Sequence, residues 1–143
     1  MIVPYRRVLL MAACLFGAAQ TSAEACRCRE PATTKAAYSL AALVVEGEVI
    51  DLSPRPEIDG FVVRLKVTNA WKQDTPEQIS FTTGSDCRFA VEHGKPYLLF
   101  FVKTPAGDLT TGRCMGNGPT AAKQKAIAWL KKGARSGKVL VGP

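Results

Sequence analysis

The chain has a single histidine and, after its first 25 residues, no apolar stretch long enough to cross a membrane. His93 precedes Gly94 in an expected turn, so we interpret it as a surface residue rather than as a metal ligand or a base. With no second histidine, a Cys-His or Ser-His-Asp catalytic set has little support. We therefore expect neither enzymatic activity nor a cofactor.

The sequence also lacks internal repeats, low-complexity tracts and any run of five basic residues. Its formal net charge is +7, but the lysines are spread along the chain, which is typical of a solvated basic surface. Residues 61–71 and 78–83, two expected strands, offer few exposed aromatic side chains on which bases could stack. We therefore expect no nucleic-acid partner.

The first 25 residues have the pattern of a secretory signal peptide. Arg6 and Arg7 give it a positive start, residues 8–19 form a short apolar stretch, and small residues follow. The pattern predicts an extracytoplasmic protein, either secreted or periplasmic. The arginine pair also suggests twin-arginine export, although the surrounding residues do not support that route.

Two cleavage sites fit the small-x-small rule, one after Ala23 and one after Ala25. The second matches A-x-A in full and is favoured, and it leaves a chain of 118 residues that begins at Cys26. That length suits one domain with a modest core. A lipoprotein interpretation would lipidate Cys14, but only residues 8–11 form the apolar stretch before it, so this is the minor alternative.

The mature chain would hold four cysteines, namely Cys26, Cys28, Cys87 and Cys114. An even number in a small exported domain predicts two disulfides. A bond between Cys26 and Cys28 would close a very tight ring, so we expect each of them to be joined separately to Cys87 or Cys114. A zinc site is the weaker interpretation, because the second pair is not a close C-x-x-C.

The pattern of apolar residues predicts a mainly β domain. Residues 32–42 are alanine-rich and predict a short helix capped at Thr33 or Thr34. Alternating and β-branched residues predict five strands, at 43–52, 61–71, 78–83, 97–103 and 109–112. We expect the prolines at 54 and 56 to end the first strand, and the almost wholly apolar strand 97–103 to be the most buried.

A second helix is expected from Thr120, as its cap, to about Lys132. Trp71 is expected to pack at the rim of a strand end. These patterns divide the chain into a signal peptide (1–25), one domain (26–133) and a mobile tail (134–143). Five short strands with a helix before and a helix after them favour a five-stranded, OB-like barrel.

A set of short motifs runs from the expected mature N-terminus to the last helix. They are CRC at 26–28, LVVEGEV at 43–49, AWK at 70–72, GKPYLL at 94–99 after the third cysteine, and LTTGRC at 109–114. Their order and spacing resemble the tissue inhibitors of metalloproteinases (TIMPs) and the wider netrin-like modules, and bacterial exported proteins of this kind look more similar to this chain than the animal inhibitors do. The resemblance covers the chain from Cys26 to about Leu130 and implies the same OB barrel.

The resemblance also implies a disulfide pairing and a function. It pairs Cys26 with Cys87 and Cys28 with Cys114. It implies that the chain inhibits a secreted zinc metalloprotease, with the α-amine and carbonyl oxygen of Cys26 chelating the zinc of that protease. The side chain of Arg27 would then enter the primary specificity pocket of the protease.

Arg27 departs from the family, because its long, charged side chain requires a pocket with a carboxylate to pair with it. Two interpretations therefore remain open from the sequence. The strip Cys26-Arg27-Cys28 is either an inhibitory segment or a staple of a non-inhibitory exported OB module, one that binds a protein, a glycan or an anionic polymer. In both cases we expect a monomer.

Overall fold

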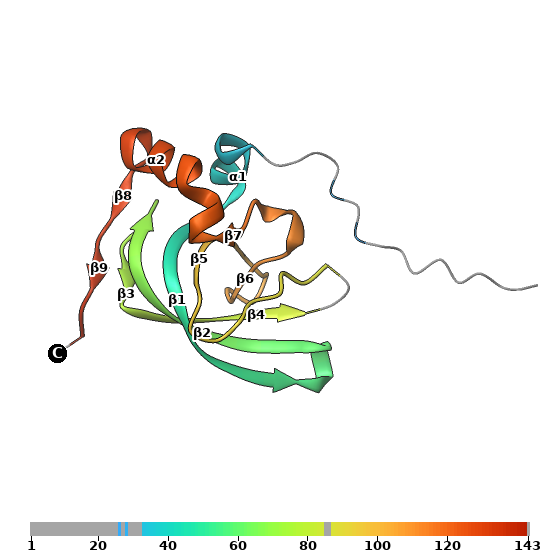
Figure 1. The fold of residues 1–143 in the computed structure, drawn as a ribbon. Helices are drawn as coiled ribbons and strands as arrows, with labels where there is room; N and C mark the ends of the chain where they lie inside the picture. Colours follow the sequence, from blue (N-terminus) through green and yellow to red (C-terminus); the bar gives the residue numbers. More distant parts are fainter. Residues whose placement is uncertain (1–25, 27, 29–32, 85–86, 143) are drawn as a thin grey trace, which may run out of the picture.

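The computed structural model describes residues 26, 28, 33–84 and 87–142, and these form a β-barrel covered at one end by two helices (Figure 1). The barrel strands are β1 (Leu43–Arg55), β2 (Gly60–Trp71), β4 (Gln78–Gly84), β5 (Pro96–Lys103) and β6 (Leu109–Thr110). They pair in the order β1-β2-β4-β6-β5, and β5 pairs back with β1 to close the barrel. Among these five barrel strands, β4 and β6 are the one pair that runs parallel. The five expected strands and the OB-like barrel are therefore confirmed.

The barrel has an inner and an outer apolar cluster. Alternate residues of β1 and β2 point inward, including Val45, Val49 and Leu65, where they meet the T-shaped pair Phe81 and Phe101. The outer cluster lies under the helices and contains Val44, Trp71, Leu98, Phe100, Ile127 and Leu130. Strand β5 contributes to both clusters, so its residues 97–101 are all buried, as its apolar sequence predicts.

Strand β1 is longer than the sequence predicts. It continues through Pro54 to Arg55, and Pro54 faces Phe61 in the register with β2. The prediction that proline ends the ladder was wrong because β5 pairs with β1 only as far as Glu48. Beyond that point the other edge of β1 has no strand beside it. Pro54 lacks an N–H, and on that edge no hydrogen bond between strands is lost. The turn to β2 is a 3₁₀ turn, η1 (Pro56–Ile58).

The two helices lie side by side over the outer cluster (Figure 1). Helix α1 (Thr34–Leu40) is capped by Thr33, whose hydroxyl accepts a hydrogen bond from the Ala36 amide at 3.1 Å. Helix α2 (Gln124–Gly133) follows a 3₁₀ turn, η3 (Thr120–Lys123). Thr120 does not cap α2 as expected, because the 3₁₀ turn moves the start of the α-helix to Gln124. No helix in the described part of the chain has the length and apolarity needed to span a bilayer.

Trp71 is buried, only 2% exposed, rather than at a rim, because α2 covers the end of β2. The segment after α2 was expected to be a mobile tail, but it carries two short strands. Strand β8 (Ser136–Gly137) pairs with β2, and β9 (Val139–Leu140) pairs with β3 (Thr75–Pro76). These pairings use backbone groups, which composition does not reveal.

Candidate functional site

Two disulfides attach the start of the described chain to the barrel. Cys26 is bonded to Cys87, in the loop between β4 and β5, and Cys28 is bonded to Cys114, in the 3₁₀ turn η2 (Arg113–Met115). In each pair the Cα atoms are 5.2 Å apart. This is the pairing that the family resemblance implies. It connects residues 61 and 86 positions apart in the sequence.

The two anchor points are themselves joined. The Arg113 amide donates a hydrogen bond to the Cys87 carbonyl oxygen at 2.8 Å, which ties the turn η2 to the loop that carries Cys87. The Cys26 sulfur lies 3.9 Å from the Cys114 sulfur, so the two disulfides are neighbours. Cys28, Cys87 and Cys114 are exposed and Cys26 is partly buried. We call these four cysteines the disulfide patch.

A buried asparagine supports the disulfide patch from inside. The Asn117 side-chain amide donates to the carbonyl oxygen of Gly112, which immediately precedes η2, at 3.0 Å, and to the Thr111 hydroxyl at 2.7 Å. Its carbonyl oxygen accepts a hydrogen bond from the Phe100 amide of β5 at 2.7 Å. The turn carrying Cys114 is therefore fixed to the most buried strand of the barrel.

A hollow of about 310 Å³ opens beside the disulfide patch. Its wall includes Cys26, Cys87 and Cys114 together with Val102, Thr111 and Met115. Cys26 and Cys28 are thus each fixed to the barrel by a disulfide, and Cys26 lies at the wall of this hollow.

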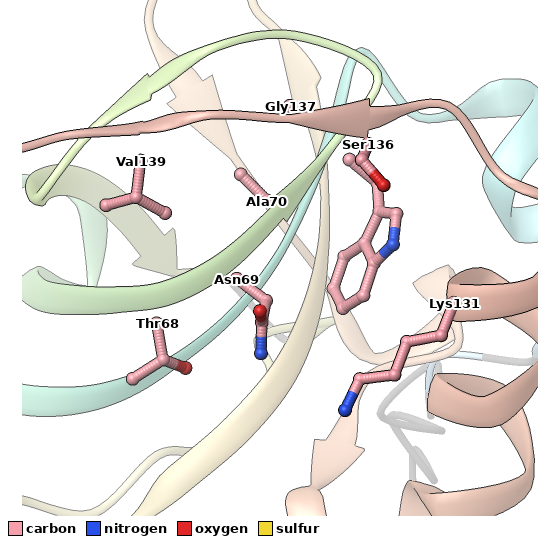
Figure 2. A pocket seen from close by; sticks show the side chains of 8 residues that line it. Thr68, Asn69, Ala70, Lys131, Ser136, Gly137 and Val139 are labelled. Carbon is pink, nitrogen blue, oxygen red and sulfur yellow. The ribbon is translucent and has the colours of Figure 1, made fainter.

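A second hollow, of about 330 Å³, lies between the end of β2, α2 and β8 (Figure 2). In Figure 2, Lys131 extends from α2 toward the β2 residues Thr68 and Asn69. Both β2 residues already bond to Glu46: the Thr68 hydroxyl donates to its carbonyl oxygen and the Asn69 amide to its carboxylate. These polar groups therefore already form hydrogen bonds between β2 and β1 in the barrel wall.

Among the described residues, the clear pKa shifts lie outside both hollows. A hydrogen bond from the backbone and one from Arg55 hold the pKa of the Glu57 carboxyl below its ordinary value. A hydrogen bond to Glu92 raises the pKa of Lys95. All four side chains are exposed, so these pairs contribute little to stability.

The structure describes some of the site residues predicted from the sequence but not others. Cys26 and Cys28 are brought together with their partners, whereas Arg27, Ala23 and Ala25 lie outside the described residues. His93 is exposed, with one ring nitrogen 3.1 Å from the Ile50 carbonyl oxygen. Within the described ranges, no three His, Cys, Asp or Glu side chains are grouped closely enough to hold a metal ion.

Asn117 was missed as a site residue by sequence reasoning. The only signal was its place in the motif Gly-Asn-Gly, which reads as a loop. No protein-family model matches the chain, and a search of curated proteins found no significant match.

Proposed function

We propose that the mature chain is an exported, TIMP-like inhibitor that binds a secreted zinc metalloprotease through the strip Cys26-Arg27-Cys28. The observation that carries this proposal is the disulfide patch. Two neighbouring disulfides hold both cysteines of the strip on anchors that are hydrogen-bonded to each other. One disulfide would be enough to attach this segment to the barrel. Two disulfides fix both ends of the strip, which favours a segment that is ordered before a partner binds.

The chemistry of the strip depends on cleavage after Ala25. Cys26 then carries a free α-amine, whose pKa is about 8, and its thiol is occupied in a disulfide. The deprotonated amine and the carbonyl oxygen of the same residue form a five-membered chelate with a metal ion. Placed at the open coordination position of a protease zinc, this chelate displaces the catalytic water.

Arg27 sets the class of protease. Its guanidinium enters a specificity pocket at a cost of several kcal/mol unless a carboxylate pairs with it. The target we propose is therefore a zinc protease whose specificity pocket contains an acidic side chain, rather than one with a purely apolar pocket.

The first test is the intact mass of the exported protein, measured with and without reduction. We expect a chain that begins at Cys26 and holds both disulfides. A chain beginning at Glu24 contradicts the proposal, because two extra residues leave Cys26 without a free amine. Free thiols in the purified protein contradict it as well.

The second test compares the mature chain with a variant that retains Ala25 and is otherwise identical. Both are titrated against a panel of secreted zinc proteases, with Arg27→Ala as a third arm. We expect inhibition by the mature chain, almost none by the extended chain, and weakening by Arg27→Ala at a protease with an acidic pocket. Equal inhibition by the first two excludes the amine as a ligand. No inhibition of any protease favours a non-inhibitory OB module.

A further inference from the structure

The C-terminal part of the chain carries positive charge with no acidic residue to offset it. From Leu109 to the last residue the chain has seven Lys or Arg residues and no Asp or Glu. The ion pairs of the described residues use Arg55, Arg64, Lys66 and Lys95, all of them earlier in the chain. Basic residues after Leu109 therefore keep their charge uncompensated by any carboxylate that the structure describes.

Helix α2 presents part of this charge next to an exposed aromatic side chain. Its buried face consists of Ile127 and Leu130. Lys125, Trp129 and Lys132 follow one another at helical spacing on the exposed face. Trp129 is 37% exposed, although tryptophan is usually more buried than this in a small domain.

Helix α1 extends the same surface. The ring of Tyr38 packs edge-to-face on Trp129, with 5.7 Å between the centroids, and its hydroxyl accepts a hydrogen bond from the Arg135 amide. The two helices lie together over one end of the barrel (Figure 1). We call Tyr38, Lys125, Trp129 and Lys132 the helical face.

Carboxylates in neighbouring segments do not neutralise the helical face. Asp74 accepts a hydrogen bond from the Lys138 backbone amide, and the Glu46 carboxylate accepts one from the Asn69 side chain. Neither carboxylate forms an ion pair with a lysine of α2 among the described residues.

We propose that the helical face docks on an anionic lipid bilayer. Lysines flanking an exposed tryptophan match the bilayer interface, where the ammonium groups meet lipid phosphates and the indole lies at headgroup depth. A soluble polyanion would account for the lysines, but it would leave exposed Trp129 without a role. The docking is peripheral and reversible, and it would hold the exported protein near the membrane it has crossed. It requires neither cleavage after Ala25 nor inhibition of a protease.

The test measures partition of the mature protein onto phosphatidylcholine vesicles with and without phosphatidylglycerol. We expect binding only with the anionic lipid, weakening as salt is raised. Lys125→Gln with Lys132→Gln should lower the partition coefficient about 30-fold, since each lysine near the surface contributes about 1 kcal/mol. The matched control is Arg64→Gln with Lys66→Gln on the barrel wall, where we expect less than about a twofold change, because both residues already form ion pairs.

Tryptophan fluorescence tests the orientation. On binding, the emission of Trp129 should shift to the blue, while Trp71 is already buried. Trp129→Phe should remove this shift, and the variant should stay folded because Trp129 lies on the exposed face of α2. The proposal is overturned if anionic vesicles bind no better than neutral ones, or if both lysine pairs have equal effects. It is also overturned if the protein binds dextran sulfate but not the anionic bilayer.

Discussion

The side chain of Asn117 completes the hydrogen bonding of Phe100 in the middle of β5. On one side β5 pairs with β1, and on the other it pairs first with β7 (Gly118–Pro119) and then with β6. Phe100 falls in the gap between β7 and β6. There its amide donates to Asn117 at 2.7 Å, and its carbonyl oxygen accepts from the Thr111 hydroxyl at 2.6 Å. Two side chains thus replace a missing strand in the barrel wall.

Replacing Asn117 should therefore be costly. Asn117→Ala leaves the buried Phe100 amide without a partner and the Gly112 carbonyl with only the Met115 amide, and we expect the free energy of unfolding to fall by about 2–4 kcal/mol. The matched control is Asn69→Ala, which removes one half-buried hydrogen bond to the Glu46 carboxylate and should cost less than about 1.5 kcal/mol. Urea unfolding with both disulfides intact measures the two changes. Equal losses would contradict the bridging role of Asn117.

Lys72 ties the end of β2 to the end of α1. Its ammonium group donates to the carbonyl oxygens of Tyr38, at 2.7 Å, and of Ala41, and lies 4.9 Å from the centre of the Tyr38 ring. Lys72→Met removes the cation from the helix C-terminus while keeping the stem, so we expect a loss of about 1–2 kcal/mol. Hydrogen exchange should show that the amides of α1 lose protection.

The backbone conformation of Lys72 allows a second test at the same position. Lys72 has φ +78°, in the left-handed region that favours glycine. Lys72→Gly loses the same cation but relieves that strain, so it should be less destabilising than Lys72→Met, by about 0.5–1 kcal/mol. If Lys72→Gly is the more destabilised variant, the strain is not the dominant backbone effect.

The barrel itself could be predicted from the sequence because its strands alternate or are wholly apolar. Val63, Leu65 and Val67 point inward between exposed neighbours, and residues 97–101 are buried on both faces of β5. The errors fall where tertiary context overrides a local rule. Pro54 is tolerated because no strand lies on its open side, and Trp71 is buried because α2 happens to cover it.

The candidate site was only partly visible in the sequence. The four cysteines after the expected signal peptide predict two disulfides, because an even number of cysteines in a small exported domain is typical of disulfide bonding. The proximity of the two bonds depends on the backbone bond from Arg113 to Cys87, which joins segments with no shared pattern. The helical face was hidden for a similar reason, because Tyr38 and Trp129 come from opposite ends of the domain.

Each disulfide should stabilise the barrel measurably. Removing one pair, Cys26→Ser with Cys87→Ser, should lower the free energy of unfolding by about 2–4 kcal/mol, because the bond closes a long loop in the unfolded chain. Cys28→Ser with Cys114→Ser should have a similar effect. Far-ultraviolet circular dichroism should stay unchanged, because the inner cluster contains no cysteine. A single-pair variant as stable as the wild type would contradict a stabilising role for that bond.

Gly137 offers a direct test of whether the C-terminal segment is docked. A β-carbon on Gly137 would lie 1.9 Å from the Gln73 carbonyl oxygen and 2.5 Å from its carbonyl carbon, so Gly137→Ala must push β8 away from the loop between β2 and β3. We expect the free energy of unfolding to fall by about 1–3 kcal/mol. The matched control is Gly133→Ala at the end of α2, where a β-carbon meets nothing within 4 Å. That control should be neutral or stabilising by up to about 1 kcal/mol.

Hydrogen exchange locates the effect of Gly137→Ala. The amides of Lys72, Thr75 and Glu77 donate to carbonyl oxygens of the C-terminal segment at 2.8–3.0 Å, and they have no partner if that segment is released. They should be protected in the wild type and in Gly133→Ala, and should exchange faster in Gly137→Ala. Amides of β5 should keep their protection in all three proteins, because the closed barrel does not depend on β8. Fast exchange at these three amides in the wild type would mean that the segment is a free tail after all.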